Sequence, residues 1–317
     1  METNKQSHLA VELVKIDSER AGQRLDNFLI AKLKGIPKSR IYKMFRKGEV
    51  RVNKGRIKPQ YRLLEGDVVR VPPVRVSAQP EKEISVPFLK DKLESRVLYE
   101  DERLLVLNKP SGMAVHGGSG LSYGVIEALR AIRPDCHHLE LVHRLDKETS
   151  GCLVIAKKRS ALRALHELFR GDGVNKRYLA LLVGQFTQKY QLIDLPLDKN
   201  IRISGERMVT VSKDGKPSQT EFRLKRSFAD FTLIEAKLRT GRTHQIRVHA
   251  AHTGYPLAGD ERYGVDVVNQ KLRKLGLKRL FLHSSRIAFK LPSSEDYIDV
   301  EAPLDSDLAN FLEKLPA

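Results

Sequence analysis

Residues 141–156 read LVHRLDKETSGCLVIA, and this stretch decides how the second part of the chain is organised. Its last five residues, 152–156, are uniformly apolar, which predicts a strand buried on both faces. The polar residues 143–151 therefore form a loop between two apolar segments. Catalytic residues often lie on such a loop, because the scaffold beneath it is rigid. Taken alone, Asp146 followed by threonine and serine is also ordinary turn chemistry.

The apolar pattern around this stretch predicts an α+β fold with a mostly antiparallel mixed sheet and flanking helices. Two hairpins are expected, at 97–107 and 220–236, together with a strand at 178–183. Helical spacing of apolar residues predicts helices in the ranges 125–132, 160–169, 243–252 and 308–315, with Ser160 as a cap.

The N-terminal part reads as a smaller domain of helices plus a hairpin, at residues 17–76. Apolar residues recur at Leu25, Phe28, Leu29 and Leu33, which is one face of a helix. A second, basic helix is expected to begin at a Ser39 cap and to end at a glycine, followed by strands at 50–52 and 68–71. Residues 77–95, rich in Pro, Glu, Lys and Ser, are predicted to be a linker to a second domain at 96–317.

Positive charge is concentrated in the N-terminal domain. The whole chain has 317 residues and a formal net charge of +18, and residues 17–76 hold 16 basic against 6 acidic residues. Such a patch attracts phosphate backbones without reading bases. A charged, soluble surface is the alternative, but the one-sided clustering favours nucleic acid as the partner.

Composition also excludes several classes of protein. No apolar run reaches the length of a membrane-spanning helix, and the N-terminus lacks a secretory signal pattern. Two cysteines cannot build a disulfide framework. We therefore expect a cytoplasmic protein without a membrane partner. Nothing suggests a large apolar interface, so we expect a monomer.

Three further segments could carry chemistry beside the loop of Asp146. Tyr178 follows Lys176 and Arg177, so it could stack on a nucleobase or pack at a sheet edge. Residues 240–249 read TGRTHQIRVH, which places His244 and Arg247 on one helical face. The histidine spacing there does not match a helical zinc site, so capping or hydrogen bonds to phosphate are the better interpretation.

In the order in which they occur, the motifs K-P-x-G at 109–112, H-R-L-D-x-x-T-S-G at 143–151, K-x-Y-x-A at 176–180 and G-R-T-H-Q-I-R-V-H at 241–249 resemble those of the RluA-type pseudouridine synthases. A later motif, 254–260, matches except that Tyr255 stands where the family often has histidine. The N-terminal motifs, R-L-D-x-F-L at 24–29 and G-x-V-x-V-N at 48–53, resemble the S4 RNA-binding domain. The whole chain is thus similar to bacterial synthases that modify large-subunit rRNA.

The resemblance implies isomerisation of uridines to pseudouridine in 23S rRNA, with no metal and no cofactor. By this resemblance Asp146 is the catalytic carboxylate and Arg247 is its cationic partner. Tyr178 would stack on the target base and help to remove the C5 proton. Whether the carboxylate is a nucleophile or stabilises charge stays open. Arg144 would fill the space that the base vacates. Residues expected at the RNA are Arg144, Arg242 and His244 near the site and Lys38, Arg40, Lys43, Arg46, Lys47, Arg51, Lys54 and Arg56 in the S4 domain.

Other functions remain to be separated by experiment. An RNA-binding assembly factor would need the S4 domain but not Asp146. A tRNA-directed synthase would use the same site on another RNA. A metal-dependent hydrolase is the least favoured reading.

Overall fold

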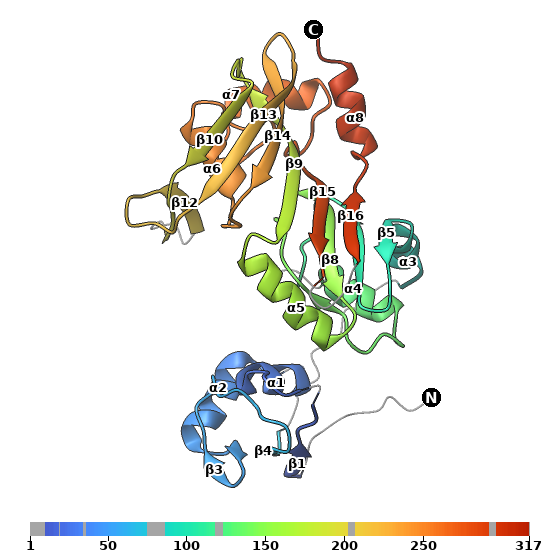
Figure 1. The fold of residues 1–317 in the computed structure, drawn as a ribbon, viewed down its shortest axis with the longest axis vertical. Helices are drawn as coiled ribbons and strands as arrows, with labels where there is room; N and C mark the ends of the chain where they lie inside the picture. The colour runs from blue at the N-terminus through green and yellow to red at the C-terminus, as the bar shows by residue number, and fades with distance from the viewer. Residues whose placement is uncertain are drawn as a thin grey trace. The chain divides into compact units, whose positions relative to one another are not determined.

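The computed structural model describes residues 10–18, 20–33, 36–74, 86–117, 123–201, 207–291 and 296–316. The chain divides into two compact units, Met1–Glu83 and Ile84–Ala317 (Figure 1). Among the described residues, no helix is both long and apolar enough to cross a membrane.

In its described residues, the first unit forms a four-stranded antiparallel sheet with two helices. Its elements are β1 (Glu12–Lys15), α1 (Leu25–Lys32), α2 (Lys38–Lys47), β2 (Arg51–Val52), β3 (Gly55–Arg56) and β4 (Val68–Val71), and the strand order is β1-β4-β2-β3. Leu25, Phe28, Leu29 and Leu33 are all buried in its core, as their spacing predicts. The sequence does not predict β1, whose residues alternate between exposed and half-buried.

Two details of α2 show what the sequence could and could not indicate. The helix ends at Gly48 in the left-handed conformation (φ 68°), as expected for a glycine cap. The predicted cap at Ser39 is wrong. Pro37 precedes the first helical residue, and Ser39 lies inside the first turn without a capping hydrogen bond. A proline suits this boundary because its fixed φ leads into a helix and its missing N–H needs no partner.

The second unit is built on one large mixed sheet. Its elements are α3 (Val86–Glu94), β5 (Val97–Glu100), β6 (Leu104–Lys109), α4 (Val125–Ile132), β7 (Glu140–Leu141), β8 (Ser150–Ala156), α5 (Arg159–Arg170), β9 (Val174–Val183), β10 (Tyr190–Asp194), β11 (Leu197–Ile201), β12 (Arg207–Val211), β13 (Gln219–Ser227), β14 (Phe231–Leu238), α6 (Gln245–His252), α7 (Asp266–Lys274), β15 (Leu282–Lys290), β16 (Tyr297–Glu301) and α8 (Ser306–Glu313).

The sheet runs in the order β10-β13-β14-β9-β15-β8-β6-β5, with β16 beside β15 and β7 beside β8 (Figure 1). The described strand pairs are antiparallel except β15 with β8, where His283 aligns with Ser150. This confirms the predicted α+β class. The strand β8 is buried along its whole length because α4 and α6 pack with the core on one face and α5 packs on the other.

Two predictions for this unit need correction. The segment 77–95 is not a linker throughout, because Val86–Glu94 forms α3 and buries Leu89 and Leu93 in the main core. The other part of that segment, up to residue 85, lies outside the described residues. Ser160 does not cap α5, which begins at Arg159 after Lys158. The helix expected at 243–252 begins at Gln245.

Candidate active site

A pocket of about 310 Å³ opens where the loop before β8, the start of β9 and the start of α6 meet. Asp146, Tyr178 and Arg247 all line it, so the structure brings together the three residues that the motifs single out. Leu238 of β14 and Leu282 of β15 supply apolar walls. An apolar pocket with a few convergent polar groups is the usual form of a site for a small group such as a base.

A buried lysine donates hydrogen bonds to backbone carbonyls of the Asp146 loop and of the segment that follows β6. Lys109, at the end of β6, is fully buried, and its Nζ donates to the carbonyl oxygens of Lys147 (3.0 Å), Met113 (2.8 Å) and Pro110 (2.9 Å). Three acceptors suit the three N–H donors of an ammonium group, although burial lowers its pKa to about 7. The loop position next to Asp146 is therefore fixed from inside the protein.

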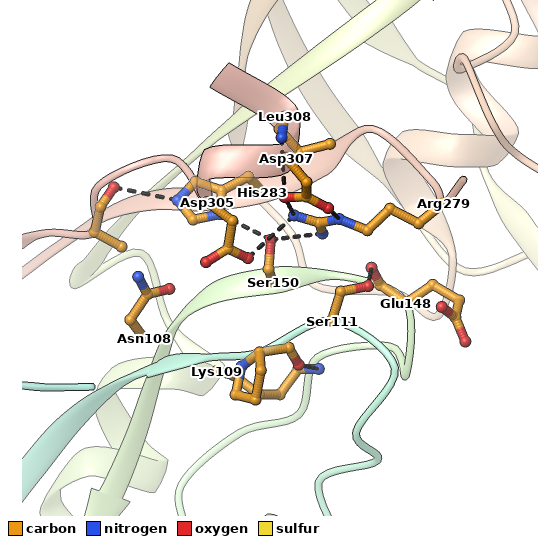
Figure 2. A network of polar contacts seen from close by, with 12 residues as sticks. Asn108, Lys109, Ser111, Glu148, Ser150, Arg279, His283, Asp305, Asp307 and Leu308 are labelled. Carbon is orange, nitrogen blue, oxygen red and sulfur yellow. Dashed lines mark hydrogen bonds and ion pairs between the residues drawn. The ribbon is translucent and has the colours of Figure 1, made fainter. Parts of the chain in front are cut away.

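A second network fixes the other end of the loop, where Ser150 enters β8 (Figure 2). The Ser150 hydroxyl lies 2.9 Å from Nδ1 of His283, and Nη1 of Arg279 donates to it at 3.0 Å. Arg279 also pairs with Asp305 and Asp307 at the start of α8. Burial lowers the pKa of His283, so the ring is neutral and its Nε2–H can donate to the carbonyl of Ala302 at 3.1 Å.

Gly151 allows β8 to approach β15 closely at this point. Its φ is +104°, and a Cβ there would lie 2.2 Å from the carbonyl oxygen of Ser284. The left-handed backbone and the missing side chain are both required, which explains the glycine after Ser150.

Arg247 is the central cation of the pocket. It is 8% exposed, and it binds the fully buried Asp260 through two hydrogen bonds, from Nε at 2.7 Å and from Nη2 at 2.6 Å. Its Nη1 lies 3.5 Å from Oδ2 of Asp146. Burial lowers the pKa of Arg247, but its pairing with Asp260 outweighs burial and raises the pKa overall. Asp260 thus aims a permanent positive charge at the Asp146 carboxylate.

Tyr178 projects from β9 into the main core and the pocket. It is 7% exposed, and burial raises the pKa of its hydroxyl, with the Asp146 charge adding to the effect. The phenol is therefore neutral at physiological pH. A flat, neutral ring that lines the pocket is suited to stacking on a base.

His244 lies beside the Asp146 carboxylate, deeper in the pocket than a residue that only contacts the RNA backbone would need to be. Its Nε2 is 3.7 Å from Oδ2 of Asp146, and its Nδ1 is 2.8 Å from the hydroxyl of Tyr263. Burial lowers the pKa of His244, which makes the ring neutral. The residue precedes α6 with φ of 54°, a conformation that is uncommon for a residue other than glycine. The aromatic ring of Tyr263 also lies 5.1 Å from the Arg247 guanidinium carbon.

The other predicted RNA-contacting residues are exposed. Arg144 and Arg242 lie at the edge of the pocket. In the first unit, the eight predicted basic residues all lie on α2 or on the β2–β3 hairpin, and all are exposed: Lys38, Arg40, Lys43, Arg46, Lys47, Arg51, Lys54 and Arg56.

Sequence reasoning missed several residues that build the site. Lys109 and Asp260 lie in motifs that were recognised, but local pattern does not reveal their partners, which are distant in sequence. Tyr263 had no signal at all. Within the described ranges, no group of three His, Cys, Asp or Glu side chains could hold a metal ion.

Comparison with known proteins gives the class of this site. Residues 103–252 match the model of the RNA pseudouridylate synthase family, and residues 23–69 match the S4 domain. The chain is 56% identical over 309 residues to ribosomal large subunit pseudouridine synthase C of Yersinia pestis, with 97% of each chain covered. It is 54% identical over 310 residues to the protein of the same name from Escherichia coli strain K12, with 96% of this chain and 97% of that one covered.

A solved structure agrees with these sequence matches. Human RNA Pseudouridylate Synthase Domain Containing 4 is 27% identical, with a TM-score of 0.60, and the match covers 73% of this chain and 98% of that one. The chain therefore belongs to the RNA pseudouridylate synthase family and carries an S4 domain. It is an RNA pseudouridine synthase, an isomerase, as the motifs indicated.

Proposed function

We propose that this enzyme isomerises specific uridines of 23S rRNA and that Asp146 is its catalytic carboxylate. The observation that carries the proposal is the pocket itself, where the Asp146 carboxylate faces the Arg247 guanidinium at 3.5 Å and shares the cavity with Tyr178. The names of the two relatives at 54–56% identity support large-subunit rRNA as the substrate. With an rRNA substrate, we place the enzyme in the cytoplasm.

The reaction needs one carboxylate and no external reactant. The N1–C1′ bond of uridine breaks, the base turns, and a C5–C1′ bond forms while the C5 proton leaves and N1 gains a proton. Asp146 either attacks the nucleotide or stabilises positive charge on the sugar. Either role needs an ionised carboxylate beside a cation that does not move, and Asp260 holds Arg247 in that position.

Tyr178 and the exposed arginines act on the RNA. A uridine must leave its stack to enter a pocket of this kind, at a cost of about a few kcal/mol. Tyr178 offers a ring for the extruded base, and its raised pKa favours stacking over proton abstraction. Arg144 would fill the vacated space in the RNA, and its exposed position at the edge of the pocket supports this role.

The S4 domain supplies binding that does not depend on the reaction. Its exposed basic residues on α2 and the β2–β3 hairpin would contact phosphates, which position an RNA without specifying a base. Removing this unit should weaken RNA binding and make binding less sensitive to salt.

Pseudouridine mapping in cells tests the proposal. Cells that lack the gene should lose modifications in 23S rRNA, and the wild-type gene should restore them while Asp146→Asn should not. Modifications lost from tRNA instead would make the enzyme tRNA-directed. Rescue of growth by Asp146→Asn without restored modification would favour an assembly factor, whereas restored modification would remove the catalytic role of Asp146.

A further inference from the structure

Lys176 is a buried cation in the active-site pocket that the mechanism does not yet use. It lies at the start of β9, two residues before Tyr178, so the two side chains project from the same face of the strand. Lys176 is 9% exposed and lines the pocket with Tyr178, Asp146 and Arg247. Its Nζ lies 5.9 Å from the centre of the Phe169 ring, on α5.

Among the described residues, no hydrogen bond and no ion pair within 4 Å holds the ammonium group of Lys176, and the one anion that acts on it, Asp172, lies beyond that distance. The other buried cations of this unit differ: Lys109 donates to three carbonyls, and Arg247 binds Asp260 through two hydrogen bonds. Burial lowers the pKa of Lys176, and the charge of Asp172 offsets that effect only in part. Burying a cation without a hydrogen bond or a close ion pair is costly, and the Phe169 ring and the more distant Asp172 are weak compensation in the free protein.

The charge balance of the pocket indicates what the missing partner is. Asp146 and Asp260 share one Arg247, which leaves this trio with a net negative charge. A phosphodiester would be repelled from it, yet an extruded nucleotide carries a phosphate on each side of its sugar. Arg144 and Arg242 add exposed positive charge at the edge of the pocket, and Lys176 adds a buried cation next to the ring that would receive the base.

We propose that Lys176 binds a phosphate that flanks the target uridine and thereby holds the extruded nucleotide against Tyr178 and Asp146. The inference rests on the proposed function, because it requires an RNA nucleotide in this pocket. A neutral uracil carbonyl is a weaker match, because it would leave the charge of the desolvated ammonium unbalanced.

The test compares enzyme variants on RNA with one altered phosphate. The substrate is a short RNA that contains a uridine modified by the wild-type enzyme, with tritium at C5, whose release reports turnover. Two further versions carry a neutral methylphosphonate, one 5′ and one 3′ of that uridine. The enzymes are wild type, Lys176→Met, Lys176→Arg and, as a control, Lys274→Met, whose lysine is exposed on α7 and does not line the pocket.

On the all-phosphate RNA, Lys176→Met should lower kcat/KM by about 10- to 100-fold, the range for a lost hydrogen bond to a charged group. Lys176→Arg should recover part of that loss, and Lys274→Met should match wild type. On one of the two methylphosphonate RNAs, the kcat/KM of wild type should fall by a similar factor relative to the all-phosphate RNA. The kcat/KM of Lys176→Met should fall little further on that RNA. That RNA identifies which phosphate is bound.

Two results would overturn the proposal. One is that Lys176→Met lowers kcat/KM by the same factor on both methylphosphonate RNAs as on the all-phosphate RNA, which would mean that Lys176 acts independently of either phosphate. The other is a Lys176→Met protein that is clearly less stable than wild type without RNA, since a buried cation held by no hydrogen bond or close ion pair should contribute little to the stability of the fold. If wild type modifies tRNA and not 23S rRNA, the proposed substrate fails, but Lys176 is still judged on the RNA that is modified.

Discussion

The substitution Asp260→Asn tests how Arg247 is held. Asn keeps the shape of the side chain but removes its charge, and its amide NH2 opposes a guanidinium that only donates. Asp260 is fully buried and Arg247 is 8% exposed, so solvent does little to screen the pair. Removing one partner from a buried ion pair costs about 3–5 kcal/mol, and we expect the free energy of unfolding of the second unit to fall by that amount.

The same substitution should slow the reaction, because Arg247 would no longer be fixed 3.5 Å from Asp146. A displacement of about 1 Å at a catalytic group can cost about 100-fold in rate, and we expect a kcat lowered by that order with KM less affected.

Urea denaturation of the full chain and single-turnover rates on RNA supply the two measurements for Asp260→Asn. The matched control is Glu261→Gln, because Glu261 pairs with Arg273 on the surface, where both side chains are at least half exposed. That control should lose less than about 1 kcal/mol. If Asp260→Asn loses no more stability than the control and keeps kcat within threefold, Arg247 is not positioned by Asp260, and this account of the site is wrong.

Two further substitutions test the loop around Asp146. Gly151→Ala should lower the free energy of unfolding by about 3 kcal/mol or more, since the added Cβ would lie 2.2 Å from the Ser284 carbonyl oxygen. Gly254 has a similar φ but open space around it, so Gly254→Ala should lose only about 1 kcal/mol. Equal urea midpoints for the two variants would contradict the close contact. His143 accepts the Val154 N–H at Nε2, and burial lowers its pKa from 6.5 to about 3. As the pH falls, the unfolded chain therefore takes up a proton at this histidine before the folded chain does. The free energy of unfolding should fall between about pH 6.5 and pH 3 as a result. His143→Gln should reduce that slope by about 1.4 kcal/mol per pH unit, and an unchanged slope would show that His143 is not the group responsible.

Short-range pattern was enough to predict the architecture where apolar residues repeat. The buried strand at 152–156, the hairpins and the helix of Leu25 to Leu33 follow from periodicity alone. Pattern failed where the local signal was weak. The helix α3 is short and partly charged and gains its stability by packing against α4 and burying Leu89 and Leu93 in the main core. The strand β10 places the apolar residues Tyr190 and Leu192 at exposed positions, so its sequence does not show the apolar alternation that predicts a half-buried strand.

In the candidate site, too, some residues could be predicted from local pattern and others could not. Asp146, Tyr178 and Arg247 could be selected because each lies within a recognisable motif, and the structure places all three in one pocket. Their supporting contacts could not be predicted, since Lys109 reaches a carbonyl 38 residues away and Arg279 reaches Ser150 from a distance of 129 residues. Such contacts are set by tertiary packing and have no local signature.

The central claim is that the Asp146 carboxylate carries out the isomerisation in this pocket. The most direct test is a single-turnover assay with purified wild-type and Asp146→Asn enzymes, both saturating a 23S rRNA transcript. We predict that the two proteins bind the transcript with similar affinity and that wild type forms pseudouridine while Asp146→Asn forms none. Pseudouridine formed by Asp146→Asn at a rate near that of wild type would contradict the claim.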